Sequence, residues 1–310
     1  MPEFYLIPKR LARKSPRLTA AVKSVEAVSF RGIFWLMRRL SVENALRLSG
    51  FTFGLIGPLT DKASKARENL AIAFPDKSDA WRRKTTRKIF NHLGRSAAEL
   101  IKLDQIWEER EKRVELVFEP GARELMASKR PTVYLTAHVG AWQVATLVTR
   151  EFDIDISAIY APESNPIMSD VMMGLRQSLG DHLIPTDAGP RPLIQTLKDG
   201  GSIVMAMDTR PETGKLIPFF GRDALTSTSP AGLALRTNSN LLVSRAERLP
   251  GAKYRITVYT PLTSPIPDAP VKEQSVALTA MVHEYFEAWI REYPEQWVCL
   301  KRRWPKAHKL

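Results

Sequence analysis

The feature that most constrains the fold is an alternation of short apolar runs and helix-like segments between residues 132 and 259. The expected strands are residues 132–136, 154–160, 202–207, 241–246 and 254–259, and the expected helices are residues 140–150, 166–179, 191–198 and 231–236. Strands that alternate with helices favour parallel βαβ units. The sequence therefore predicts an α/β fold with a central, mostly parallel sheet.

Two titratable residues directly follow apolar strands of this pattern. His138 comes between the first strand and the turn at Gly140, and Asp208 follows the strand at residues 202–207, with Arg210 two residues further on. Open α/β sheets bind ligands at the carboxyl ends of their strands, and an imidazole titrates near neutral pH. His138 is therefore a catalytic candidate. The alternatives are a structural histidine, an aspartate that caps a loop and an arginine that pairs with it.

Composition and missing motifs exclude several classes of protein. The chain has 310 residues, 44% hydrophobic content and a single cysteine, Cys299. No Cys/His cluster has metal-ligand spacing, so we expect neither a metal nor another cofactor. Serine-hydrolase, P-loop, dinucleotide-binding and zincin motifs are absent. The first ten residues lack a signal-peptide pattern, and we expect a protein on the cytosolic side.

A strong positive charge indicates an anionic partner. The formal net charge is +13, and residues 1–40 hold nine Lys and Arg against two Glu. Nucleic acid, anionic membrane lipid and an acidic carrier protein would each suit this charge. No helix-turn-helix or other recognition module accompanies it, so we do not favour nucleic acid.

Residues 1–60 are predicted to form a basic, amphipathic, membrane-associating arm, and residues 61–310 the α/β domain. The longest uncharged run, residues 48–60, has 13 residues, whereas a membrane span needs about 20. One helical face carries large apolar side chains: Phe30, Ile33, Phe34, Met37 and Leu40. A helix of this kind lies in the membrane interface or packs on its own domain. The interleaved aromatic and basic residues at 294–304 also suit a lipid–water interface.

Several motifs occur together in a specific order. They are Asn-Leu-Ala-Ile-Ala-Phe-Pro at 69–75, His-Val-Gly-Ala-Trp at 138–142, the segment of Arg176 and Gly180, Asp208, Pro-Phe-Phe-Gly at 218–221 with Thr226, Leu233 with Ala234, Tyr-Pro-Glu-Gln-Trp at 293–297, and Arg-Arg-Trp at 302–304. In this set the chain resembles the bacterial lipid A late acyltransferases, the lauroyl and myristoyl transferases. The phosphatidylinositol mannoside acyltransferases are relatives of that family. The resemblance runs from about residue 28 to 305.

The resemblance implies a single glycerolipid-acyltransferase-like domain on the cytoplasmic face of the inner membrane. It implies transfer of a fatty acyl chain from acyl carrier protein, or from coenzyme A, to a hydroxyl of a lipid A precursor. The basic arm suits an acidic carrier protein and an anionic membrane surface together.

The resemblance also assigns roles to individual residues. The family's His-x4-Glu/Asp motif falls on His138, the implied general base, and on Gln143, where the carboxylate that orients the imidazole is replaced by an amide. Its arginine and aspartate fall on Arg176, which would bind a phosphate or steady the oxyanion, and on Asp208. Further departures are Ala141 and Thr209. The candidate substrate-binding residues are Arg210, Thr226, Arg302 and Arg303.

Gln143 leaves two hypotheses open. A glutamine can accept a hydrogen bond from the ring, but it is neutral and can equally donate, which selects the wrong tautomer. Under the first hypothesis, the wrong tautomer makes the chain a catalytically impaired, lipid-binding member of the fold. Alternatively, Asp208 supplies the missing charge, and the chain is an active O-acyltransferase.

Overall fold

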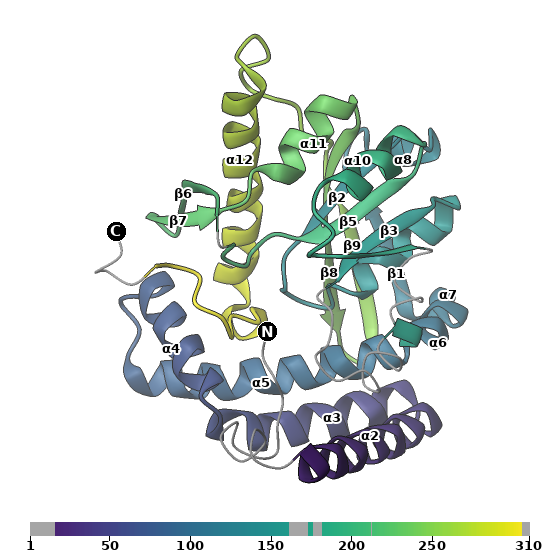
Figure 1. Ribbon diagram of the computed structural model, residues 1–310, viewed down its shortest axis with the longest axis vertical. Coiled ribbons are helices and arrows are strands. Elements are labelled where there is room, and N and C mark those ends of the chain that lie inside the picture. The colour runs from purple at the N-terminus through teal and green to yellow at the C-terminus, as the bar shows by residue number, and fades with distance from the viewer. Residues whose placement is uncertain (1–15, 161–172, 176–181, 212, 306–310) are drawn as a thin grey trace.

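The structure, a computed structural model, describes residues 16–160, 173–175, 182–211 and 213–305. Its centre is a seven-stranded sheet in the order β1-β9-β8-β2-β5-β3-β4 (Figure 1). The strands are β1 (Val114–Phe118), β2 (Thr132–Thr136), β3 (Ile156–Tyr160), β4 (His182–Pro185), β5 (Ser202–Ala206), β8 (Asn240–Leu249) and β9 (Lys253–Val258). Neighbouring strands are parallel except β8 and β9, which pair antiparallel. The predicted α/β class and mostly parallel sheet are confirmed.

Helices cover both faces of the sheet. The first layer is built from α4 (Lys62–Ala73), α10 (Arg191–Lys198), α11 (Ser229–Thr237) and α12 (Val271–Glu292). The second contains α3 (Val42–Ile56), α6 (Leu103–Glu108), α8 (Ala122–Ala127) and the 3₁₀ helix η2 (Val144–Phe152). The remaining helices are α2 (Pro16–Arg39), α5 (Asp79–Ile101), α7 (Arg110–Arg113) and the 3₁₀ turns η1 (Gly57–Leu59) and η4 (Pro294–Gln296).

Strand β2 lies between the two layers. All five of its residues are buried. Val133 and Leu135 belong to the core under α12, whereas Tyr134 belongs to the core under η2. Side chains alternate across a strand, so a strand covered on both faces is apolar throughout. Burial on both faces therefore explains the continuous apolar run that predicted this strand from the sequence.

The segment after β2 differs from the expected α-helix at residues 140–150. Gly140 has a φ of +67°, and a Cβ there would lie 2.3 Å from the Ala246 carbonyl oxygen, so residues 138–143 form a loop. The following helix is 3₁₀. The hydroxyls of Thr146 and Thr149 bond to carbonyls three residues earlier, at Gln143 and Thr146, and such bonds compete with regular helical geometry.

Other strands were not expected from the sequence. These are β1, β4 and a separate antiparallel hairpin of β6 (Lys215–Phe219) and β7 (Arg222–Thr226). The hairpin lies beside α12 (Figure 1). The helix expected at residues 166–179 lies outside the described residues, apart from 173–175, which are helical.

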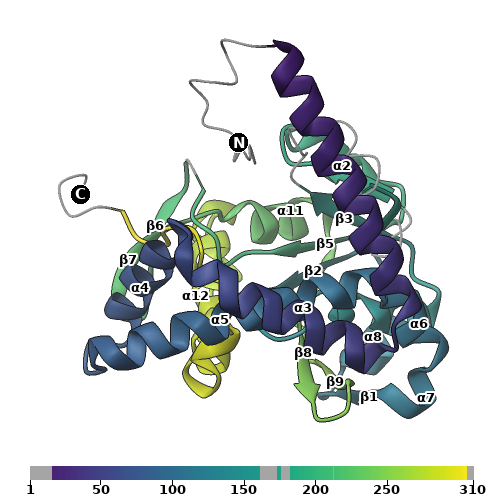
Figure 2. The same cartoon turned by 90° about the horizontal axis from the view of Figure 1, so that it is seen from below.

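The N-terminal helices α2 and α3 lie beneath α5, on one side of the molecule (Figures 1 and 2). Helices α3 and α5 approach closely at Gly94, where a Cβ would lie 2.4 Å from the Ser49 carbonyl oxygen. The expected apolar face of α2 is divided. Met37 is buried in the domain core, whereas Ile33 is 55% exposed and Trp35 is 61% exposed. Part of the arm is therefore integral to the domain, and the rest presents apolar side chains outward.

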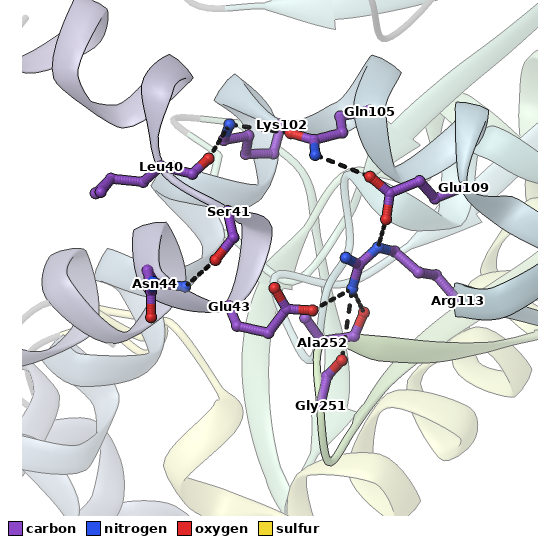
Figure 3. Close-up of polar contacts among 10 residues, drawn as sticks. All are labelled: Leu40, Ser41, Glu43, Asn44, Lys102, Gln105, Glu109, Arg113, Gly251 and Ala252. Carbon is purple, nitrogen blue, oxygen red and sulfur yellow. Dashed lines mark hydrogen bonds and ion pairs between the residues drawn. The ribbon is translucent and has the colours of Figure 1, made fainter.

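Part-buried polar contacts fix the corner between α2 and α3 (Figure 3). The Lys102 ammonium donates to the carbonyls of Arg38 and Leu40, at 2.8 and 2.5 Å. A cation at the carboxyl end of a helix also interacts favourably with the helix dipole. The Arg113 guanidinium joins Glu43 on α3 to Glu109, with N–O distances of 2.7 and 2.8 Å. The direction of the arm relative to the sheet is thus set by specific contacts.

Candidate active site

The site begins where the adjacent parallel strands β2 and β5 end. Thr136 pairs with Ala206 in the sheet, so the residues two positions further on, His138 and Asp208, emerge side by side. His138 Nδ1 lies 2.7 Å from Asp208 Oδ1, and the backbone N–H of His138 donates to the same oxygen at 3.0 Å. The fold thus joins two residues that are 70 positions apart in the chain.

The second oxygen of Asp208 also accepts an N–H group. Trp297 Nε1 donates to Asp208 Oδ2 at 3.0 Å, and both side chains are buried. Burial by itself raises the pKa of a carboxyl. The imidazole of His138 and the three hydrogen bonds outweigh burial and hold the pKa of Asp208 below its usual value. Asp208 is therefore ionised at neutral pH.

The same pair sets the protonation and tautomer of His138. An ionised carboxylate only accepts hydrogen bonds, so Nδ1 carries a proton and Nε2 keeps its lone pair in the neutral ring. Burial lowers the pKa of His138, but the charge of Asp208 and its hydrogen bond outweigh burial and raise the pKa above the usual value. The side chain is 31% exposed. His138 is an accessible base with a fixed orientation.

Gln143 does not make the orienting contact expected from its place in the motif. Asp208 occupies Nδ1 of the ring, and Gln143 Oε1 is buried without a hydrogen-bond partner among the described residues. The physical reason is local: residue 143 immediately precedes η2, whereas Asp208 approaches from the neighbouring strand. Trp142 contacts the ring instead, edge-on, with centroids 5.4 Å apart.

The C-terminal segment closes the site from another side. The backbone N–H of Val298 donates to the His138 carbonyl at 2.9 Å. Asn69 on α4 fixes the segment, because its side-chain amide donates to the carbonyls of Cys299 and Lys301 and its oxygen accepts the N–H of Arg303. Trp297 and Trp304, expected at a lipid–water interface, are instead buried.

The four candidate substrate-binding residues fall into two groups. Arg303 is 1% exposed; it donates to the Thr226 hydroxyl at 2.7 Å and to the Leu225 carbonyl at 2.8 Å. Burial lowers the pKa of Arg303 to about 10. Arg302 instead pairs with Glu68 at the surface, 2.6 Å away. Arg210 is exposed.

Two cavities meet at His138. One, of about 390 Å³, is bordered by polar groups of Asp208, Thr209, Lys301 and Arg303. The other, of about 300 Å³, is bordered mainly by apolar side chains: Leu100, Trp142, Ala158, Leu183 and Val204. They share Ile159, Met205 and Ala206. The two cavities differ in charge: besides His138, the first is lined by Asp208, Lys301 and Arg303, whereas the second has no other charged lining residue. A titratable base therefore stands between a charged and an uncharged cavity, as suits a substrate with a polar head and a hydrocarbon chain.

The catalytic candidate Arg176 lies outside the described residues. Within the described part of the chain, no group of three or more His, Cys, Asp or Glu residues could hold a metal ion. Sequence reasoning gave no role to Asn69 or Trp297, although both lie in the motifs. Asn69 lies on the apolar face of a helix, and a polar side chain at such a position indicates a buried hydrogen bond. This was the one indication of its role in the sequence.

The chain is similar to known proteins over most of its length. The family described as bacterial lipid A biosynthesis acyltransferase matches residues 20–306. The lipid A biosynthesis lauroyltransferase of Escherichia coli is 26% identical over 88% of this chain and 89% of its own length. The myristoyltransferase of the same organism is 23% identical over 79% and 77%. A 1-acyl-sn-glycerophosphate acyltransferase structure from Thermotoga maritima covers 80% of this chain and 97% of its own, with 15% identity and a TM-score of 0.36.

Proposed function

Because the chain belongs to the bacterial lipid A biosynthesis acyltransferase family, we propose that it moves a fatty acyl chain from a thioester donor to a hydroxyl of a lipid A precursor. The donor is acyl carrier protein or coenzyme A. The observation that carries the proposed chemistry is the His138–Asp208 pair between a cavity with charged lining residues and one without further charged residues.

His138 acts as the general base of the transfer. The acceptor hydroxyl gives its proton to Nε2 as its oxygen attacks the thioester carbonyl, which forms a tetrahedral intermediate. Collapse of the intermediate expels the thiolate, and the imidazolium returns the proton to sulfur. The products are an ester and a free thiol. Asp208 stabilises the imidazolium during both steps, as the acid of a catalytic triad does.

The two cavities divide the substrates by charge. The uncharged cavity accepts the acyl chain, and the charged cavity accepts a hydroxyl-bearing head group beside Lys301 and Arg303. Arg303 is a buried cation without a carboxylate within 4.0 Å among the described residues, so an anionic group of the substrate relieves its desolvation. Thr226 positions Arg303 and acts through it. We retain Arg176 as a proposed donor to a phosphate or to the oxyanion.

A catalytically impaired, lipid-binding protein is the second candidate function, and Gln143 is the observation that favours it. An amide in place of the motif carboxylate removes the charge that would hold the ring. Asp208, hydrogen-bonded to the ring, supports the active alternative.

The protein acts at a membrane surface. Exposed apolar side chains of α2, α3 and η1 include Val28, Ile33, Trp35, Phe51, Leu55, Ile56 and Leu59. Arg31, Arg38, Arg39 and Arg47 are exposed on the same helices, and this combination suits an anionic lipid interface. In the described residues, no helix is both long enough and apolar enough to span a bilayer. We propose peripheral association on the cytoplasmic face of the inner membrane.

The test uses purified protein, acyl carrier protein loaded with a labelled acyl chain, and a lipid A precursor. We expect His138→Ala to lower transfer by about 10²–10⁴-fold, the usual contribution of a general base. Its thermal unfolding and vesicle binding are the controls, and both should be unchanged. Full activity in a folded His138→Ala protein would remove this residue from the mechanism.

A further inference from the structure

A third cavity, of about 380 Å³, lies on another side of the loop at residues 138–143 and does not include His138. It is formed by α5, the end of β8 and η4. Its polar lining residues are Lys88, Asn91, His92, Arg95, Arg248, Glu295 and Gln296. We call it the Arg95 cavity.

The cavity contains more positive charge than its own carboxylates neutralise. Arg248 is balanced by Glu99 in a buried pair, with two N–O distances of 2.6 and 2.7 Å. Lys88 has only a loose contact with Glu295, at 3.8 Å. Arg95 makes no hydrogen bond and no ion pair within 4.0 Å with a described residue, although the charge of Glu99 reaches it, and its Nε atom is buried and unpaired. The guanidinium of Arg95 is half-buried, and no hydrogen-bond acceptor among the described residues offsets the cost of its desolvation.

His92 adds a neutral donor at the wall. It is buried, and its Nδ1 lies 2.7 Å from Arg248, so Nδ1 accepts and Nε2 carries the proton. Nε2 has no acceptor of ordinary hydrogen-bond geometry in the described structure, although the Gly140 carbonyl lies near it. The amides of Asn91 and Gln296 supply further donors. Three cations, of which Glu99 neutralises Arg248, and several neutral donors thus border one open cavity.

The position of the cavity connects it with the membrane-facing helices. The stem of Arg95 crosses α3 at Gly50, where a Cβ would lie 3.0 Å from Arg95 Cγ. The next residue on α3, Phe51, is 64% exposed, and Figures 1 and 2 show α3 directly against α5 on the side of the arm. On the opposite wall, Gln296 lies near Gly140 in the catalytic loop.

We propose that the Arg95 cavity binds the phosphate monoester of a membrane lipid. A dianionic phosphate matches the charges of Lys88 and Arg95 and faces a single lining carboxylate, Glu295; its oxygens accept hydrogen bonds from the Lys88 ammonium and the Arg95 guanidinium. Placement beside the exposed apolar helices puts the site at the depth of lipid head groups. The inference does not depend on acyl transfer, because none of these residues takes part in the proposed chemistry.

The test compares two double variants of α5 in vesicle sedimentation. Lys88→Gln with Arg95→Gln removes the two cations of the cavity that Glu99 does not neutralise and leaves Arg248 in place. The matched control, Arg83→Gln with Arg87→Gln, removes two exposed charges of the same helix that do not line it. The probes are phosphatidylcholine vesicles that contain either phosphatidic acid, a phosphate monoester, or phosphatidylglycerol at equal surface charge. The vesicle measurements with both lipids can be repeated with His138→Ala protein. A failure of the proposed reaction is therefore distinguished from a failure of the proposed phosphate site.

We expect the unaltered protein and the control to bind phosphatidic acid vesicles about tenfold more tightly than phosphatidylglycerol vesicles, a typical effect of hydrogen bonds to a charged group. The cavity variant should lose this preference, and Arg95→Lys should retain most of it. If the cavity variant does not fold, Lys88→Gln alone should reduce the preference. A preference absent from the unaltered protein, or equally lost in both double variants, overturns the proposal.

A kinetic experiment with the cavity variant identifies which lipid carries the phosphate that binds in the Arg95 cavity. If it belongs to the acceptor lipid, the cavity variant should raise the KM for the acceptor and leave kcat unchanged. If it belongs to a bilayer phospholipid, only vesicle binding should fall. Either result supports the site, whereas unchanged KM together with an unchanged vesicle preference contradicts it.

Discussion

Replacement of Asp208 by asparagine tests the electrostatic part of the mechanism. Both carboxylate oxygens accept N–H groups, from His138 on one side and from Trp297 on the other. An asparagine has one accepting end and one donating end. If its NH₂ group faces His138, it donates to Nδ1 and moves the ring proton to Nε2. If it faces Trp297, two donors meet in a buried site.

The loss expected from Asp208→Asn follows from the geometry. At the observed 2.7 Å between Nδ1 and Oδ1, an effective dielectric constant of about 20 gives roughly 6 kcal/mol of attraction between imidazolium and carboxylate. A carboxylate-to-amide change in the serine-protease triad lowers turnover by about 10⁴-fold, or about 5 kcal/mol. The two magnitudes agree, so we expect a loss on the order of 10⁴-fold in kcat.

The pH profile separates this role from a purely structural one. Asp208 raises the pKa of His138 against the effect of burial, and only the neutral ring accepts a proton. Activity should therefore rise with pH through this raised pKa. In Asp208→Asn, burial and the charge of Lys301 remain, and both lower the pKa of His138, so the residual kcat/KM should begin to rise at lower pH. Two results would refute this role of Asp208: a folded Asp208→Asn protein with at least a tenth of full activity, or one whose kcat/KM begins to rise at the same pH as in the unaltered protein.

Three further predictions concern other parts of the molecule. Gln143→Glu should change turnover less than tenfold, because a carboxylate already holds the ring; a gain of several hundred-fold in the same assay would favour the impaired alternative. Glu99→Gln leaves Arg248 buried without its counter-charge and should lower the free energy of unfolding by about 3–5 kcal/mol, measured by denaturant titration; a change below about 1 kcal/mol, the value of an exposed pair, would contradict this. Trp35→Glu should weaken vesicle binding about tenfold or more, since burial of a large apolar side chain contributes roughly 1.5–3 kcal/mol. Leu216→Glu, equally apolar and exposed but on β6, is the matched control, and an equal effect of both changes would argue against the arm as the docking surface.

Most of the sheet could be predicted because its strands are buried on both faces. Such strands are runs rich in β-branched, aromatic and other apolar residues, as in β2, and they stand out in the sequence. Strand β1 and the β6–β7 hairpin are less buried and carry charged residues, including Glu115, Lys215 and Arg222. Their strand structure depends on partners elsewhere in the chain, which a local pattern does not reveal.

The sequence allowed the residues of the candidate site to be predicted, but not which of them contact each other. The positions of His138 and Asp208 after apolar strands placed both at one edge of the sheet. Their direct contact depends on strand order, because β5 lies beside β2 although β3 precedes it in the chain. The spacing within the motif suggested Gln143 as the partner of the ring, and the register of two distant strands provides Asp208 instead.

The central claim is that this chain adds an acyl chain to a lipid A precursor through His138, and mass spectrometry of lipid A tests it most directly. Lipid A would be compared among cells that contain the protein, cells that lack it, and cells that carry His138→Ala at equal abundance. The account predicts a species heavier by one ester-linked acyl chain only in cells with the unaltered protein. Identical lipid A in all three, or the heavier species in His138→Ala cells, would contradict it.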